Sequence, residues 1–188
     1  MSHLPLVQDE DATPEVRQIF QGLRRELGYD LVPNLFRALA NFPPLLVAIG
    51  DLIQRTLLAG RLPRTLKELI SLCVAVRRDC PYCKSFQAVQ LRNLGLRREI
   101  LVGICTDPGN AELPARDRSV MMFATRFAEE PESIGEPDFE ALREQGLTQD
   151  DIAETVAMAT LALVLTTLAN GLGLELDEAI AEKVPAGI

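Results

Sequence analysis

The residues best suited to chemistry in this sequence are two cysteines, Cys80 and Cys83, which are separated by Pro81 and Tyr82. Proline is favourable at the first position of a helix, so we expect the motif to begin a helix with Cys80 as its N-cap. The Cys80 sulfur then faces the free amide of Cys83, and unpaired amides and the helix dipole favour a thiolate. Because thiolates attack peroxides and disulfides, the spacing predicts a redox-active pair.

Three other interpretations of the pair have weaker support. A zinc site needs about four ligands, and the chain offers neither a second cysteine pair nor a nearby histidine. A structural disulfide between neighbours on one helical turn closes too small a loop to stabilise a fold much. A glutaredoxin-like fold would place the motif after a strand and require a later cis-proline loop, for which Val184-Pro185 is the only candidate. We therefore expect no metal and no separate cofactor.

A lone carboxylate, Glu68, lies twelve residues before the motif. An acid in the first turn of a helix usually faces water, where it can pair with a cation such as Arg64. Residues 69–76, which follow it, are almost entirely apolar, so the helix and its acid are expected to be buried. Buried acids beside thiols move protons. Gln87 shares a helix face with Cys83, either as a surface amide or as a hydrogen-bond partner of the thiol site.

The single histidine and the other two cysteines give less support for a catalytic role. His3 is the only histidine and lies in the N-terminal tail, so a Ser/His/Asp or Cys/His mechanism has no local base. Cys73 and Cys105 sit among apolar residues and are expected to pack in the core.

Composition limits the function classes. With 188 residues, of which 47% are hydrophobic, the chain can bury the core of one compact domain without disulfides. Three of its four cysteines fall between positions 73 and 83, which suits a reducing compartment, so we expect a cytoplasmic protein. The net charge of −8 argues against nucleic-acid binding. The N-terminus lacks a signal-peptide pattern, and the apolar stretch 156–169 is shorter than the roughly 20 residues of a membrane span.

Hydrophobic periodicity is helical throughout, with almost no strand alternation, so the fold is predicted to be all-α. Proline and glycine positions set the expected boundaries. We predict helices over 14–27, 34–40, 45–58, from about 64 through Cys73, 80–94, 98–105, 115–129, 138–145, 149–172 and 175–184.

An internal similarity also appears. Leu62-Pro63 recurs as Leu113-Pro114, and the segment 91–96 recurs as 142–147, both displaced by 51 positions. Two matches at one offset suggest a duplicated helical unit, although such glycine-capped helix ends are common. The same offset places Ser119, Pro131 and Ile134 opposite the acid and the two cysteines, so the second copy lacks reactive groups.

Taken together, these residues resemble the AhpD-like alkylhydroperoxidase family, within the carboxymuconolactone decarboxylase-like group and its longer peroxidase-related members. The resemblance runs from residues 32–39, through Glu68 and the cysteine pair, to the turns at 146–147 and 172–174. It implies one AhpD-like helical domain over 1–188, with an N-terminal extension 1–60, a motif core 61–105 and a second half 113–188. Glycine caps and apolar helices near 45–58 and 156–169 add the expectation of a homo-oligomer.

The resemblance implies a peroxiredoxin-type thiol peroxidase that reduces alkyl hydroperoxides. Cys83 would attack the peroxide, Cys80 would form the disulfide, Glu68 would assist deprotonation, and an external dithiol on a lipoylated or thioredoxin-like protein would restore the thiols. Which cysteine attacks first stays open, because in thioredoxin-like chemistry it is the first.

The chain departs from the family pattern at Gln87, where the family has a histidine. An amide does not exchange protons near neutral pH. The alternative is therefore a redox-sensing or catalytically weak helical oligomer. Lactone decarboxylation is disfavoured because that branch of the family relies on histidines absent here.

Overall fold

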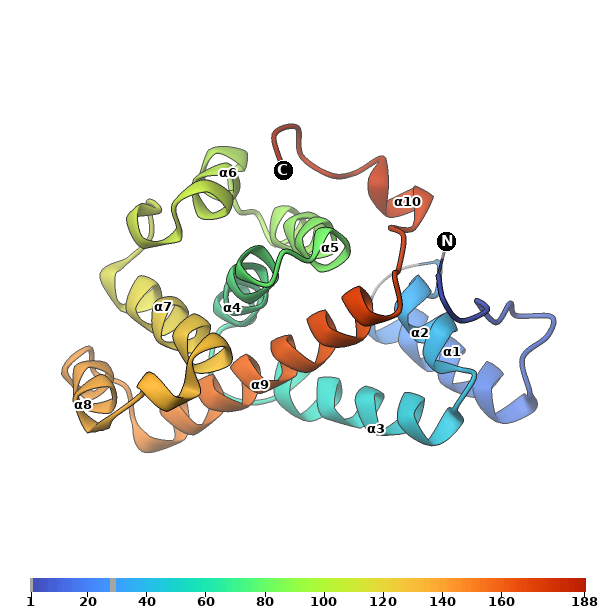
Figure 1. The fold of residues 1–188 in the computed structure, drawn as a ribbon, viewed down its shortest axis with the longest axis horizontal. Helices are drawn as coiled ribbons and strands as arrows, with labels where there is room; N and C mark the ends of the chain where they lie inside the picture. The colour runs from blue at the N-terminus through green and yellow to red at the C-terminus, as the bar shows by residue number, and fades with distance from the viewer. Residues whose placement is uncertain (1, 28–29) are drawn as a thin grey trace.

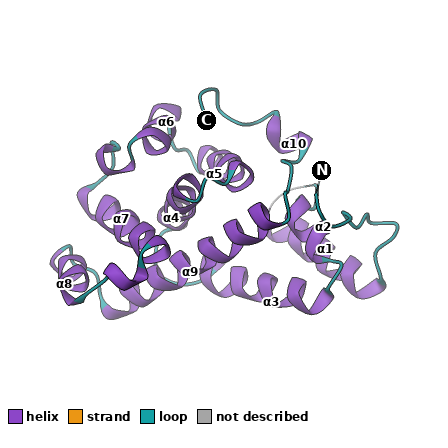
Figure 2. Ribbon diagram, in the orientation of Figure 1, coloured by secondary structure: helices purple, strands orange, loops and turns teal. Residues whose placement is uncertain are grey.

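The computed structural model describes residues 2–27 and 30–188, and within these ranges every regular element is helical (Figure 2). The all-α prediction is therefore confirmed. The α-helices are α1 (Pro14–Leu27), α2 (Asn34–Leu39), α3 (Pro43–Ile53), α4 (Arg64–Arg77), α5 (Pro81–Asn93), α6 (Arg98–Thr106), α7 (Ala115–Glu129), α8 (Glu136–Glu144), α9 (Gln149–Gly171) and α10 (Glu178–Ala181). A π-helical turn, η1 (Gln54–Leu58), continues α3, and the 3-10 turns η2 (Pro108–Asn110) and η3 (Pro131–Ser133) follow α6 and α7.

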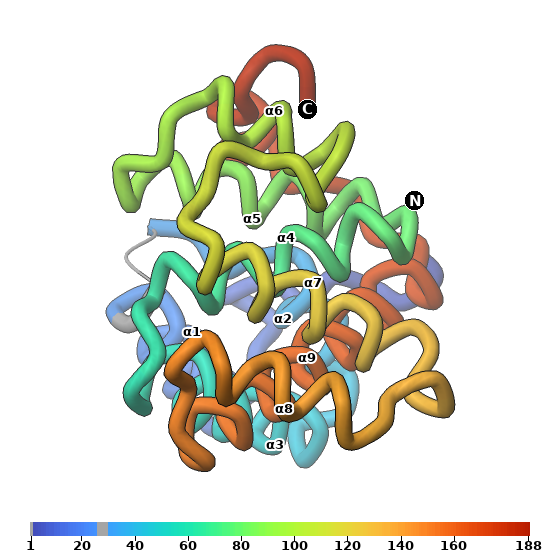
Figure 3. Tube along the Cα trace, turned by 90° about the vertical axis from the view of Figure 1, so that its left-hand side faces the viewer, coloured from blue at the N-terminus to red at the C-terminus, as the bar shows by residue number. Residues whose placement is uncertain are grey.

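Helix α4 forms the centre of the molecule and packs against α5, α7 and α9 (Figure 1). Its residues 66–75 are buried without interruption. A helix that is apolar on nearly all sides is stable in water only when other helices surround it. In Figure 1 and Figure 3, α5 and α6 lie at one end of the molecule and α3 at the other, with α4 between them. This arrangement fixes the position of Glu68 relative to the cysteine helix.

The long helix α9 begins with a capping box in which Thr148 and Asp151 bond each other's backbone amides. It is the one helix in the described ranges long and apolar enough to cross a membrane by length and composition. Here it packs against α4, α5, α7 and η1.

The 51-residue offset seen in the sequence extends to the helix boundaries. The starts of α4 and α7, at Arg64 and Ala115, are 51 positions apart, and so are the starts of α6 and α9, at Arg98 and Gln149. Both α5 and α8 end before a glycine of positive φ, Gly95 at 90° and Gly146 at 80°, where only glycine is unstrained.

Buried ionic contacts join the two halves of the chain. The Lys67 ammonium, 1% exposed, donates to the carbonyls of Thr56 (2.9 Å) and Ala59 and pairs with Glu154 of α9. Glu154 Oε2 also accepts from the backbone amides of Arg61 (2.8 Å) and Leu62 (3.1 Å). These contacts hold η1 and the start of α4 against α9.

The predicted C-terminal helix 175–184 is wrong in extent, because only Glu178–Ala181 is helical. The Asp177 side chain accepts hydrogen bonds from the Asn34 amide and from the Tyr82 hydroxyl, so tertiary contacts hold residues 174–177 out of the helix. Gly28, which follows the predicted first helix 14–27 and is the residue we expect to end it, lies outside the described residues.

Candidate functional site

The cysteine motif occupies a tight turn between α4 and α5. Asp79 has a φ of 46°, and the Cys80 amide donates to the Ala75 carbonyl at 2.9 Å, which closes the end of α4. Cys80 is the N-cap of α5 and Pro81 is its first residue. The Cys80 sulfur accepts from the Cys83 amide at 3.4 Å, so the capping geometry predicted from the sequence is confirmed.

The two thiols are free, adjacent and electrostatically unequal. The hydrogen bond from the Cys83 thiol lowers the pKa of Cys80; burial opposes this, and the amides of Cys83 and Tyr82 add to it. The same hydrogen bond raises the pKa of Cys83, as do burial and the charge of Cys80. The nearby Arg77 pairs with Glu129 at 3.0 Å. The first thiolate to form is therefore that of Cys80.

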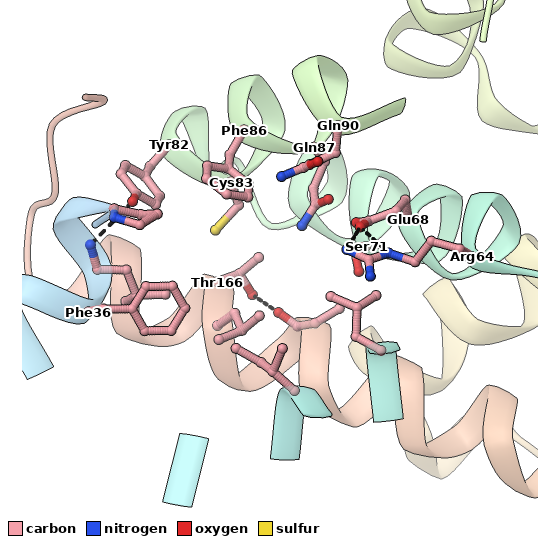
Figure 4. Close-up of a pocket in the computed structure, with 16 residues that line it drawn as sticks. Phe36, Arg64, Glu68, Ser71, Tyr82, Cys83, Phe86, Gln87, Gln90 and Thr166 are labelled. Carbon is pink, nitrogen blue, oxygen red and sulfur yellow. Dashed lines mark hydrogen bonds and ion pairs between the residues drawn. The ribbon is translucent and has the colours of Figure 1, made fainter. Parts of the chain in front are cut away.

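Only Cys83 of the pair lines the apolar pocket beside α5, which has a volume of about 50 Å³ (Figure 4). This space is enough for several water molecules or for the reactive end of a small ligand. The walls come from α2, α3, η1, α4, α5 and α9. Its apolar lining comprises Pro33, Leu35, Phe36, Ile53, Leu57, Tyr82, Phe86, Ala162 and Leu165, and its polar lining Arg64, Glu68, Ser71, Gln87, Gln90 and Thr166.

Glu68 lies in the same pocket and is 1% exposed. Its Oε1 atom accepts from Arg64, at 2.7 Å from Nε and 2.6 Å from Nη2. Burial raises the pKa of Glu68, although the Arg64 charge and hydrogen bond act in the opposite direction. Both sequence expectations hold in part, since Glu68 pairs with the partly exposed Arg64 but is itself buried rather than facing water.

Gln87 lies between Cys83 and Glu68 in the pocket (Figure 4). Its Oε1 atom and the Oε2 atom of Glu68 are buried, and neither finds a hydrogen-bond donor in residues 2–27 and 30–188. A buried acceptor without a donor costs about 1–3 kcal/mol. Two such acceptors in one pocket indicate a place for water or for a ligand with a polar hydrogen.

The structure thus brings Glu68, Gln87 and Cys83 into one pocket and keeps Cys80 beside Cys83 but outside the lining. Sequence reasoning missed Arg64 as a pocket residue, and also Ser71, Gln90 and Thr166. The signal for two of them was available: Ser71 is three residues after Glu68 and Gln90 three after Gln87, on shared helix faces.

Tyr82 has a positioning role that the sequence did not reveal. Its hydroxyl donates to Asp177 Oδ2 at 3.3 Å and accepts from the Leu35 amide at 3.2 Å. Asp177 also accepts from the Asn34 amide at 3.0 Å, and burial raises the pKa of Asp177. The motif helix is thereby tied to α2 and to the segment before α10.

Within the described ranges, no three histidine, cysteine or acidic side chains gather as a group that could hold a metal ion. The pocket lining supplies a thiol, a carboxylate, a guanidinium, hydroxyls and amides in an apolar environment.

Residues 43–109, from α3 to η2, match the model of the carboxymuconolactone decarboxylase family. This segment contains Glu68, both motif cysteines and Gln87. No curated protein matches the sequence significantly.

Solved structures establish the fold over almost the whole chain. An uncharacterized peroxidase-related protein with an alkylhydroperoxidase AhpD core, from Ralstonia eutropha JMP134, is similar with a TM-score of 0.88 and 24% identity, over 98% of this chain and 97% of that one. An uncharacterized peroxidase-related protein from Silicibacter sp. TM1040 is similar with a TM-score of 0.86 and 22% identity, over 95% of this chain and 93% of that one. A third similar structure is a cysteine-to-alanine variant of the debrominase Bmp8 in complex with 2,3,4-tribromopyrrole. Its TM-score is 0.81 and its sequence identity is 20%, over 97% of both chains. The fold predicted from the sequence is confirmed, and residues 43–109 match the model of the family that the sequence resembles.

Proposed function

We propose that the chain is an AhpD-like member of the carboxymuconolactone decarboxylase family and a thiol peroxidase that reduces alkyl hydroperoxides through Cys80 and Cys83. One observation carries the proposal. Cys83 faces an apolar pocket that contains the buried Glu68, while Cys80, with its lowered pKa, stands within hydrogen-bond reach (Figure 4). The apolar walls suit an organic substrate, and the two acceptors without donors suit the O–H of a hydroperoxide.

In the first step, the Glu68 carboxylate accepts the Cys83 proton, directly or through a water held by Gln87. The Cys83 thiolate attacks one peroxide oxygen and the O–O bond breaks. The sulfur becomes a sulfenic acid, and the leaving alkoxide takes the proton back from Glu68 as the alcohol forms.

In the second step, the Cys80 thiolate attacks the sulfur of the Cys83 sulfenic acid. The new S–S bond replaces the S–O bond, and hydroxide leaves as water after protonation. The lowered pKa of Cys80 taken alone would favour Cys80 as the first attacker. Access favours Cys83, because Cys80 does not line the pocket in which an organic peroxide would sit.

Single-cysteine variants test this order of events. We expect turnover of tert-butyl hydroperoxide with dihydrolipoamide in the wild type and none in Cys80→Ser or Cys83→Ser. Dimedone should label Cys83 in the Cys80→Ser variant. Cys73→Ala is the control, because Cys73 does not line the pocket at Cys83. This variant should turn over peroxide at the wild-type rate.

Two results would count against the proposal. Labelling confined to Cys80 in the Cys83→Ser variant would reverse the two roles. If both thiols remain free at micromolar peroxide, the protein is not a peroxidase. That result would favour a redox-inert or redox-sensing helical oligomer.

The debrominase relative motivates a second candidate, removal of bromide from a brominated heteroaromatic by the same two thiols. The two thiols would supply both electrons and become the disulfide, while bromide leaves and hydrogen replaces it. The apolar pocket with Phe36 and Phe86 in its lining favours a flat organic substrate. Free bromide released from 2,3,4-tribromopyrrole measures this activity.

We propose further that the protein is cytoplasmic and binds neither nucleic acid nor membrane. An external dithiol would reduce its disulfide after each turnover.

We also propose that the protein forms a homo-oligomer. Phe42 at the start of α3 is 61% exposed and Val47 within it is 41% exposed, which supports subunit packing at this helix. Light scattering of Phe42→Glu should show a smaller mass than the wild type, and an unchanged mass would exclude this interface.

A further inference from the structure

Cys80 opens onto a second cavity, distinct from the pocket at Cys83. This cavity has a volume of about 220 Å³, and Cys80, Lys84, Asp79, Val76 and Cys105 contribute to its walls. The two cavities share no lining residue. Cys80 and Lys84 are four residues apart on one face of α5, whereas Cys83, Gln87 and Gln90 face the other cavity. Helix α5 therefore separates the two cavities, one of which leads to the sulfur of Cys83 and the other to the sulfur of Cys80.

The cavity wall carries one charge of each sign, the Asp79 carboxylate and the Lys84 ammonium. The Cys83 hydrogen bond lowers the pKa of Cys80, while the Asp79 charge acts to raise it. Burial raises the pKa of Cys105 in the same wall, while the Lys84 charge acts to lower it and so favours an anion within the cavity. The Lys84 side chain is half-buried, and no carboxylate in the described part of the chain forms an ion pair with its ammonium group. Lys84 follows Cys80 by one helical turn, a spacing at which Cβ atoms lie roughly 6 Å apart. The protein as a whole carries a net charge of −8, so its average surface repels anions, and Lys84 offsets this repulsion beside Asp79 in the cavity wall.

The cavity also limits the shape of its ligand. Cys80 is 1% exposed, so a flat protein surface cannot reach its sulfur, while a slender chain can enter 220 Å³. This favours a small thiol, or a dithiol on a flexible arm, over a thioredoxin-like protein that presents its own cysteine pair at its surface.

We propose that the cavity at Cys80 is the entrance for a thiol reductant of the oxidised pair, with Lys84 attracting the attacking thiolate. This inference rests on the proposed function, because it assumes that Cys80 and Cys83 form a disulfide in turnover. It assigns separate entrances to oxidant and reductant, the oxidant at Cys83 and the reductant at Cys80.

The step is a thiol–disulfide exchange. The reductant thiolate attacks Cys80 Sγ, a new S–S bond forms, the Cys80–Cys83 bond breaks, and its electron pair leaves on Cys83 Sγ. The second thiol of the reductant loses its proton to Cys83 and attacks its own neighbouring sulfur. Cys80 leaves as a thiolate and the reductant leaves as a cyclic disulfide.

The test begins with the disulfide that diamide forms in the whole 188-residue chain, so it does not depend on peroxidase activity. Reduction is timed with three thiols whose thiolates carry net charges of about −2, −1 and 0: 2-mercaptoethanesulfonate, 2-mercaptoethanol and cysteamine. A unit charge at roughly 6 Å in a medium of intermediate dielectric changes the rate about tenfold. Lys84→Gln should therefore slow the sulfonate most and cysteamine least, and Lys84→Glu should enlarge the difference.

Arg92→Glu is the matched control, since Arg92 is exposed on the same helix and lines neither cavity. A second variant, Val76→Phe, narrows the cavity and should slow all three thiols equally while leaving disulfide formation by peroxide unchanged. Peptide mapping of the mixed disulfide with 2-mercaptoethanol should find the adduct on Cys80.

An adduct on Cys83, or equal effects of the Lys84 and Arg92 variants, would overturn the proposal. If diamide forms the disulfide and Lys84 governs its reduction while peroxide is not turned over, the peroxidase function fails and the entrance at Cys80 stands.

Discussion

Replacing Glu68 with glutamine separates its proposed role as a base from its place in the structure. The amide keeps the size of the side chain and an oxygen that accepts from Arg64, as Glu68 Oε1 does now. It replaces Oε2, which lacks a donor, with an NH₂ group in the pocket that also holds the unpartnered Oε1 of Gln87. It also removes a carboxylate that is 1% exposed.

These changes have opposite effects on stability and activity. A buried acceptor without a donor costs about 1–3 kcal/mol, so relief of one should raise the free energy of unfolding by about 1 kcal/mol. Loss of a positioned general base should lower the rate constant of Cys83 oxidation by about 10²–10⁴-fold. A purely structural Glu68 would not produce this combination.

The pH dependence has a defined sign. Burial raises the pKa of Glu68 above its ordinary value, so the folded state holds this proton more tightly than the unfolded state. The resulting stability is present below the unfolded pKa and is lost as pH rises through the folded pKa. Over the same range the base becomes available, so oxidation should accelerate while the wild type loses stability relative to Glu68→Gln.

Stopped-flow measurement of oxidation by tert-butyl hydroperoxide and urea unfolding, each across pH, give both quantities. Glu144→Gln is the control because Glu144 is exposed at the end of α8. An oxidation rate in Glu68→Gln within a factor of three of the wild type would refute the role of Glu68 as a base. If Glu68→Gln lowered the free energy of unfolding by several kcal/mol, the view that the Glu68 charge destabilises the folded state would be refuted.

Three further predictions concern neighbouring residues. Gln87→His should accelerate Cys83 oxidation about tenfold to a hundredfold, because an imidazole carries protons and an amide does not; an unchanged stopped-flow rate would show that the relay is not limiting. Tyr82→Phe should lower the free energy of unfolding by about 1–3 kcal/mol, because Asp177 and the buried Leu35 amide lose the hydroxyl; urea unfolding at constant pH measures it, and a neutral result would contradict it. Lys67→Met should cost about 3–5 kcal/mol in the same assay, since it leaves the Glu154 carboxylate without its buried partner; an equally stable variant would show that the pair is dispensable.

The local features of the site were accessible from the sequence because they depend on neighbours along the chain. The N-cap at Cys80, the helix end before Gly95 and the buried run after Glu68 each follow from residues within one or two helical turns. The helix starts that repeat at the 51-residue offset were predictable for the same reason.

Features that depend on distant contacts were not accessible. Asp177 meets Tyr82 across 95 positions, and this contact shortens the last predicted helix. The π-helical turn η1, which contributes Leu57 to the pocket, has no signal in hydrophobic periodicity. The separation of Cys80 and Cys83 into two cavities depends on how α5 packs against α2, α4, α6 and α9, which no single-helix pattern encodes.

The most direct test of the account is intact-mass analysis of the reduced protein before and after one equivalent of tert-butyl hydroperoxide, followed by peptide mapping. The account predicts loss of two hydrogens, a disulfide between Cys80 and Cys83, and one equivalent of tert-butanol. An unchanged mass, or a bond that involves Cys73 or Cys105 instead, would contradict it.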